Sequence, residues 1–133
     1  MTTLADQATV RTVLGLQTWA VVGLRQNPAR PAYGVAQFLQ RQGKRVVPVH
    51  HQPQDVFGES AYARLADVPH PVDVVDVFVN SSRAGDIADQ AVAIGARAVW
   101  FQLGVIDDDA AERVRAAGLL MGADRCPVIE WGR

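Results

Sequence analysis

A repeated pattern of helix, glycine and strand is the feature of this sequence that most constrains its fold. Stretches with one-sided helical spacing end at Gly43, Gly95 and Gly118, and a short apolar run follows each of them. Short buried strands that alternate with such helices are typical of parallel sheets joined by right-handed crossover connections. The pattern therefore predicts an α/β, Rossmann-like three-layer sandwich with a mostly parallel sheet of about five strands.

The same periodicities predict where the individual elements lie. Pro48 falls inside an expected strand, which favours an edge position or the last pairing of that strand, because proline has no N–H to donate. Asn80 or a serine after it, and Asp107 or Asp108, are expected to cap helices. The expected strands cover residues 19–22, 46–49, 72–79, 98–101 and 119–122, and the expected helices cover about 3–16 (capped by Thr3 and Asp6), 34–43, 61–65, 81–95 and 107–118.

Length and composition favour one domain in a reducing compartment. With 133 residues, 49% hydrophobic and 20% charged, the chain can bury one core and needs no second domain. The formal net charge of −1 argues against a general nucleic-acid binder, and the chain has one cysteine, Cys126, so no internal disulfide is expected. We see no secretory leader and no apolar run of membrane-spanning length, and we expect a cytoplasmic protein without a membrane partner.

The segment from 18 to 34 has the make-up of an anion cradle. An apolar strand, TWAVV, runs into Gly23, and a polar loop with Arg25 and Arg30 leads to an expected helix start at Gly34. Backbone N–H groups at a helix start and nearby guanidinium groups both favour phosphate. The two arginines could also be solvated loop residues, and the residues alone give the two interpretations equal weight.

In an open parallel sheet, ligands bind beyond the carboxyl ends of the strands, near the point where the strand order reverses. The polar and cationic residues of this sequence gather after those ends, as a phosphate ligand requires. Asp124, Arg125 and Cys126 follow the last strand, and Cys126 is expected to be a buried, inert thiol. The expected ligand-binding residues are Gly23, Leu24, Arg25, Asn27, Arg30, Tyr33, His50, Asn80, Arg83, Gln102 and Gly104.

A standard dinucleotide site is disfavoured. The G-x-G-x-x-G fingerprint is missing, since only Gly23 lies in the first turn, and the second strand ends in His50 and His51 with no carboxylate before Asp55. The two histidines are adjacent and no CxxC or HxxxH spacing accompanies them, so we expect no metal site. No arrangement of residues predicts a catalytic group.

Three motifs in this order resemble the small stand-alone CoA-binding proteins. They are VVGLRQNPARPAYGVAQFLQRQGKRVVPVH, GARAVWFQLGV and DRCPVIE, at residues 21–50, 95–105 and 124–130. That family is similar to the nucleotide-binding domain at the start of the succinyl-CoA synthetase alpha subunit. The resemblance covers about residues 12–131 and implies that the adenosine and pyrophosphate of CoA lie across the loops after the first three strands.

The chain departs from the family at Arg25, Ala32, His50 and Val79. The family commonly has serine, a hydroxyl residue, asparagine and arginine at or near these places. We therefore keep three hypotheses. The first is non-catalytic binding of coenzyme A or an acyl-CoA, in which any catalysis would need a protein partner. The second is a small NAD(P)-linked oxidoreductase, and the third is a regulatory or scaffolding module whose nucleotide site has decayed.

Overall fold

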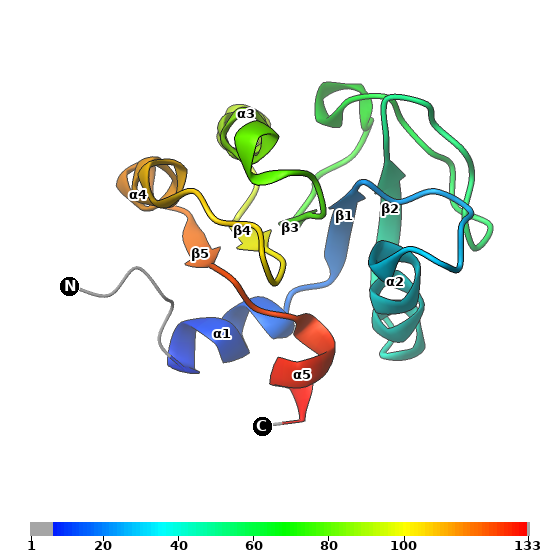
Figure 1. Ribbon diagram of the computed structural model, residues 1–133, viewed down its shortest axis with the longest axis horizontal. Coiled ribbons are helices and arrows are strands. Elements are labelled where there is room, and N and C mark those ends of the chain that lie inside the picture. Colours follow the sequence, from blue (N-terminus) through cyan, green and yellow to red (C-terminus); the bar gives the residue numbers. More distant parts are fainter. Residues whose placement is uncertain (1–6, 133) are drawn as a thin grey trace.

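The computed structural model describes residues 7–132, and these form one twisted sheet of parallel strands (Figure 1). The strand order is β2-β1-β3-β4-β5, and every neighbouring pair is parallel. This confirms the predicted Rossmann-like arrangement. The strands are β1 (Thr18–Val22), β2 (Arg45–Val49), β3 (Val74–Val77), β4 (Ala98–Phe101) and β5 (Leu120–Gly122).

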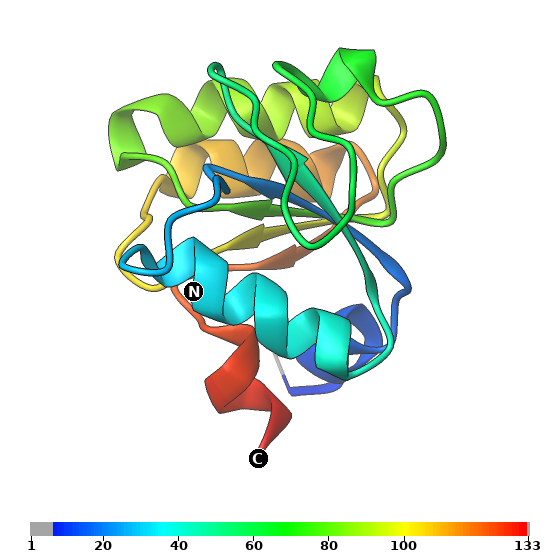
Figure 2. The ribbon, with the colours of Figure 1, turned by 90° about the vertical axis from the view of Figure 1, so that its right-hand side faces the viewer.

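Helices cover both faces of the sheet, as Figure 2 shows. The first face carries α3 (Ser81–Ala93) and α4 (Asp108–Ala116), which pack against each other. The second face carries α1 (Gln7–Leu14), α2 (Pro31–Arg41) and α5 (Pro127–Trp131). Within residues 7–132, no helix combines the length and the apolar character that crossing a membrane requires.

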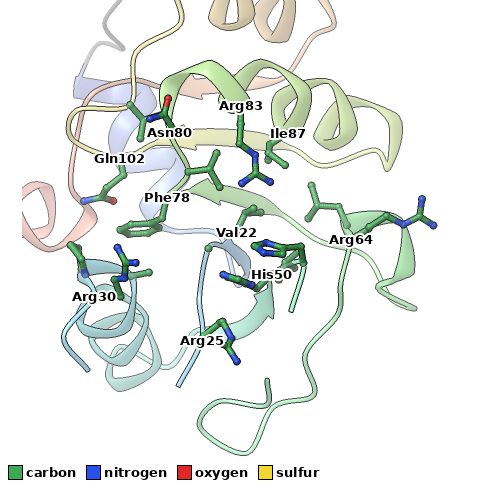
Figure 3. Close-up of a pocket in the computed structure, with 18 of the residues that line it drawn as sticks. Val22, Arg25, Arg30, His50, Arg64, Phe78, Asn80, Arg83, Ile87 and Gln102 are labelled. Carbon is green, nitrogen blue, oxygen red and sulfur yellow. The ribbon is translucent and has the colours of Figure 1, made fainter. Parts of the chain in front are cut away.

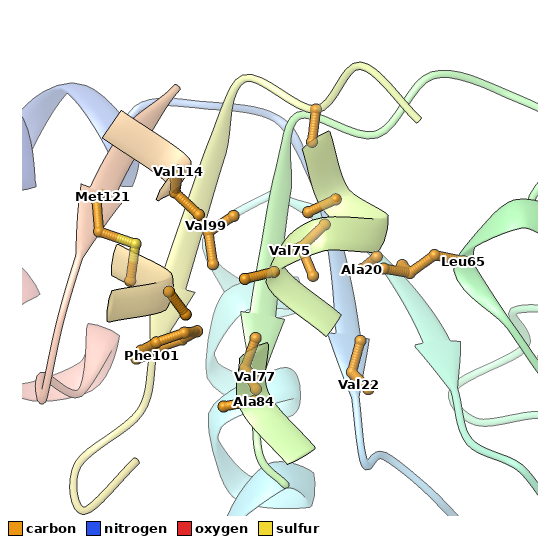
Figure 4. Packing of buried hydrophobic residues seen from close by; sticks show 14 of the residues in the cluster. Ala20, Val22, Leu65, Val75, Val77, Ala84, Val99, Phe101, Val114 and Met121 are labelled. Atoms are coloured by element: carbon orange, nitrogen blue, oxygen red, sulfur yellow. The ribbon is translucent and has the colours of Figure 1, made fainter. Parts of the chain in front are cut away.

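The core on the α3/α4 face is built from alternate strand residues (Figure 4). Val75 and Val77 of β3 point to this face together with Val99 and Phe101 of β4, since successive side chains of a strand alternate between faces. Helix α3 meets them with small residues at helical spacing, which lets its backbone approach the sheet closely. These residues are Ala84, Ala88 and Ala91, and none has any exposed surface.

The opposite face holds two tryptophans and one buried acid. The rings of Trp19 and Trp100 lie 5.9 Å apart between their centroids, and each indole N–H donates to a backbone carbonyl, that of Leu16 and that of Arg125. Asp76 points to this face between Val21 and Trp100 of the neighbouring strands and has no exposed surface. This buried carboxyl group is therefore part of the core on this face.

Most predicted elements are confirmed, including β4 at residues 98–101 and the caps at Asn80 and Asp107. The edge position predicted from Pro48 is also confirmed, because β2 is an edge strand. The Pro48 carbonyl accepts a hydrogen bond from Tyr62 N–H (3.0 Å) on the outer side of β2. The backbone nitrogen of Pro48 points to the same outer side as its carbonyl, so the missing N–H removes no hydrogen bond to β1.

The predicted start of the second helix at Gly34 was wrong. Helix α2 begins at Pro31, with Arg30 as its N-cap residue. Proline fits the first helical position because its fixed φ matches the helix and its missing N–H has no partner there in any case. Gly34 lies inside the helix, and Ala32, before it in the first turn, is already buried.

Three other elements differ from the prediction. The expected helix at 61–65 is absent, because Tyr62 bridges to β2 at Val49 and only the short 3₁₀ helix η1 (Leu65–Asp67) follows. Strand β3 is shorter than 72–79, since the chain leaves the sheet after Val77 towards α3. Helix α5 was missed because five residues are too few to show a helical period. The expected caps at Thr3 and Asp6 lie outside the described residues.

Candidate functional site

A cavity of about 770 Å³ opens at the carboxyl ends of β1, β2 and β3 (Figure 3). Its floor comes from Val22, Val49 and Phe78, which are the last residue of a strand or the first beyond one. Its walls come from the β1–α2 loop, the first turns of α2 and α3, residues 63–65 and the start of the β4–α4 loop. The cavity therefore lies on the line between β1 and β3, where the strand order reverses.

Gly23 shapes the bottom of this cavity. Its φ of +106° is a conformation that other residues rarely adopt, and its N–H donates to the Val49 carbonyl at 2.8 Å. A Cβ atom at this position would lie 3.0 Å from the Phe78 carbonyl oxygen and 3.1 Å from Phe78 Cβ. Only glycine lets the turn after β1 pass this close to the end of β3.

The cavity is lined by basic side chains without a matching acid. Arg25 and Arg30 come from the β1–α2 loop, Arg83 from α3, and His50 and His51 from the end of β2. Arg64, from the segment before η1, is the sixth. Among residues 7–132, no Asp or Glu lines the cavity. A site with this charge balance favours an anion with several negatively charged groups.

The N-terminus of α2 adds to the positive potential. Pro31 and Ala32 line the cavity, and the N-cap residue Arg30 makes no side-chain capping bond, so the first turn is not closed by its own side chain. The positive end of the helix dipole and the unbonded N–H groups of such a turn favour anions. The helix start that faces the cavity is thus the one at Pro31 rather than the predicted one at Gly34.

Local hydrogen bonds hold the β1–α2 loop in place. The Asn27 side chain accepts from Ala29 N–H (3.1 Å), and the Asn27 carbonyl accepts from Arg30 N–H (3.1 Å). Gln26 N–H donates to the side chain of Gln54 (2.9 Å), which ties this loop to the one after β2. The two loops that carry Arg25, Arg30 and the histidines are therefore fixed relative to each other.

His50 and His51 stack with their ring centroids 4.4 Å apart at an interplanar angle of 24°. Burial lowers the pKa of His50, and the nearby His51, Arg25, Arg83 and Arg30 lower it further. The neutral imidazole is thereby favoured. Among the described residues no group of three His, Cys, Asp or Glu side chains is arranged to hold a metal ion.

Most of the residues that the sequence singled out converge on the cavity. Eight of the eleven line it, from the segments after β1, β2, β3 and β4 and from α3, and their contact with a ligand stays a prediction. These eight are Gly23, Arg25, Asn27, Arg30, His50, Asn80, Arg83 and Gln102.

The other three lie outside the lining. Leu24 is fully buried in the core beneath α2, Tyr33 packs on Phe57 with ring centroids 4.9 Å apart, and the Gly104 N–H donates to Asp124 Oδ1 (2.8 Å). Leu24 turns inward because the positive φ of Gly23 redirects the chain.

The site also contains residues that were not in the predicted set. Arg64 reaches the cavity because Tyr62 pairs with the edge of β2, which is a contact between distant parts of the chain. Ile87 and Gln90 lie about one and two turns after Arg83 on α3, and Phe78 follows β3 directly. The helical spacing of Arg83, Ile87 and Gln90 is the one signal in the sequence that would have found two of them.

Residues 17–132 match the sequence pattern of a family described as CoA binding domain. A similar relative is the uncharacterized protein YneT of Bacillus subtilis, which is 28% identical over 80% of this chain and 79% of its own length. A hypothetical protein from Pyrococcus horikoshii has a similar structure, with a TM-score of 0.91, 32% identity, and coverage of 97% of this chain and 92% of the other.

The protein named cell-free ID.343 from Thermus thermophilus is also similar. Its TM-score is 0.88, the identity is 36%, and the alignment covers 97% of this chain and 98% of that one. The family match spans most of the chain, and it includes every element that contributes to the cavity. The chain belongs to the CoA binding domain family.

Proposed function

We propose that this protein binds coenzyme A, or an acyl-CoA, in the cavity at the carboxyl edge of the sheet, and that it does so without catalysing a reaction. The observation that carries the proposal is the lining of the cavity: four arginines and two histidines with no carboxylate among the described residues. CoA carries a pyrophosphate and a 3′-phosphate, and guanidinium groups are well suited to both. Membership of the CoA binding domain family supports the same ligand.

The composition of the lining also supports a binding role rather than a catalytic one. Within residues 7–132, no serine, threonine, cysteine, tyrosine or lysine lines the cavity. In the described part of the chain, no hydroxyl, thiol or amine nucleophile of this kind therefore lines the cavity beside His50 and His51 for them to activate as bases. The cavity instead offers donors to phosphate oxygens and apolar walls at Ile87, Leu103 and Val105 for a less polar part of the ligand.

A ligand series tests the proposal. We expect CoA to raise the melting temperature of the ligand-stripped protein, since ligand at a hundred times its Kd stabilises a fold by about 2.7 kcal/mol. Dephospho-CoA and ADP should give smaller rises, because each carries fewer phosphate groups for the arginines. A rise with NADP or NAD but not with CoA would contradict the proposal and favour the oxidoreductase. No rise with any ligand would favour a module with a decayed site.

A further inference from the structure

His50 is the residue where β2 meets the cavity, and its backbone is fixed there. It directly follows Val49, the last residue of the strand, and its N–H donates to the Tyr62 carbonyl at 3.0 Å. Its side chain is half-buried and lines the cavity together with Arg25 and Arg83 (Figure 3). The ring thus has a defined place among the groups that face a ligand.

The ring of His50 is held in one tautomer by its own loop. The backbone N–H of Gln52 donates to Nδ1 at 3.0 Å. An Nδ1 atom that accepts this bond carries no proton, so the proton of the neutral ring is on Nε2. Within the described chain, no other group hydrogen-bonds to this Nε2–H.

The charged groups around the ring favour its neutral form. His51 stacks on it from the same loop, Arg25 and Arg30 approach from the β1–α2 loop, and Arg83 approaches from α3. A second proton would have to sit on Nδ1, where it would meet the N–H of Gln52 and break that bond. The geometry and the four surrounding basic side chains both oppose an imidazolium in the empty site.

We propose that His50 contacts the ligand as a neutral hydrogen-bond donor, giving its Nε2–H to a phosphate oxygen of the bound ligand. It acts neither as a cation nor as a general base. The ligand atom is a phosphate oxygen because three guanidinium groups surround the ring and draw phosphate to it. This inference rests on the proposed function, since the cavity must first bind CoA.

Spectra of the ligand-free protein test the tautomer without any ligand. Two-bond nitrogen–proton correlations on nitrogen-15-labelled protein at neutral pH distinguish Nε2–H, Nδ1–H and imidazolium rings. We expect the Nε2–H pattern for the signal that disappears in His50→Gln. An Nδ1–H or imidazolium pattern for that signal would overturn the inference, whatever the protein binds.

Two substitutions of His50 then separate the donor from the ring. His50→Gln keeps an uncharged N–H donor at a similar reach, and we expect its Kd for CoA to stay within about threefold of the wild type. His50→Phe keeps the ring without the donor, and we expect its Kd to rise about 10- to 100-fold, the range for a lost hydrogen bond to a charged group. His70→Phe is the matched control, since His70 lies outside the cavity lining.

The outcomes distinguish this inference from the proposed function. If wild-type protein does not bind CoA, the proposed function and the ligand contact of His50 both fail. If the wild type binds and His50→Phe binds equally well, only the role of His50 fails. Should His50→Phe not fold, titration of labelled wild type decides: CoA must shift the His50 Nε2–H resonance, and an unmoved resonance overturns the inference.

Discussion

Asp76 occupies the middle of the sheet, and replacing it by valine should stabilise the protein at neutral pH. Its exposed fraction is 0%, and neither of its carboxyl oxygens has a hydrogen-bond partner within residues 7–132. Its neighbours across the sheet are Val21 and Trp100, so the surroundings are apolar. Burial of an unpaired polar group costs about 1–3 kcal/mol in mutational data, and Asp76→Val should recover that amount. Valine also suits a buried strand.

The pH dependence gives a second measure of the same carboxyl group. Burial raises the pKa of Asp76 well above its ordinary value. Between the pKa of about 3.9 in the unfolded chain and the higher pKa in the fold, the folded protein holds one more proton than the unfolded protein. The free energy of unfolding therefore falls as the pH rises, by at most about 1.4 kcal/mol per pH unit. This stability is fully present below the unfolded pKa and is lost as the pH rises through the folded pKa.

Urea unfolding at several pH values from about 5 to 8 measures both effects. We expect the wild type to lose stability across this window more steeply than Asp76→Val, which lacks the titrating group. Asp76→Asn should share the flatter profile without the gain from the apolar side chain. The exposed Asp86→Asn serves as control and should keep the wild-type profile. Parallel profiles for wild type and Asp76→Val would mean that folding does not raise the pKa of Asp76, and a less stable valine variant would mean that the carboxyl group makes a stabilising interaction. Either result would refute the reasoning.

Three further substitutions test the site and its supports. Gly23→Ala should lower the free energy of unfolding by about 1–3 kcal/mol and weaken CoA binding, because the added Cβ meets Phe78 and the backbone φ is positive. Urea unfolding and calorimetric titration measure the two effects, and an unchanged stability and Kd would contradict the prediction. Arg30→Gln should weaken CoA binding about 5- to 10-fold and reduce its salt dependence in calorimetry, whereas Arg97→Gln, before β4 at the opposite edge, should do neither. Asn80→Ala should cost about 1 kcal/mol in urea unfolding, since its side chain caps α3 through Ser82 N–H; no loss would mean that the cap is dispensable.

The regular part of the fold could be predicted because its signals are local. Strands β1 and β4 are continuous apolar runs between turn residues, and the helices before Gly43, Gly95 and Gly118 end as expected, with positive φ at all three glycines. Each of these features depends on residues within one turn or one strand. A single-sequence pattern contains that information in full.

The failures arise where distant contacts or short elements decide the structure. Residues 61–65 have helical composition, but the backbone of Tyr62 pairs with the open edge of β2, and that pairing wins. The same contact carries Arg64 to the cavity, so the missed residue and the wrong helix have one cause. The prediction placed the start of α2 too late because it assigned Pro31 to the loop, although proline also suits a first helical turn.

The candidate site could be predicted from the rule that ligands bind at strand ends, which identified eight lining residues. The rule could not say which way each side chain points. Leu24 follows a residue with positive φ and turns into the core, whereas Arg25, the next residue, reaches the cavity. Orientation after such a turn depends on packing against α2, which no local pattern contains.

The basic lining has a consequence for the empty protein. Arg25 and Arg30 come from the β1–α2 loop and Arg83 comes from α3, which the sheet brings together, and like charges held close repel one another. That repulsion opposes the closeness of the loops, which the bonds from Gln26 to Gln54 and from Gly23 to Val49 maintain. A bound polyanion removes the repulsion as well as adding its own contacts. Stabilisation by CoA should therefore decrease as salt increases, because salt screens both the repulsion in the empty site and the attraction in the filled one.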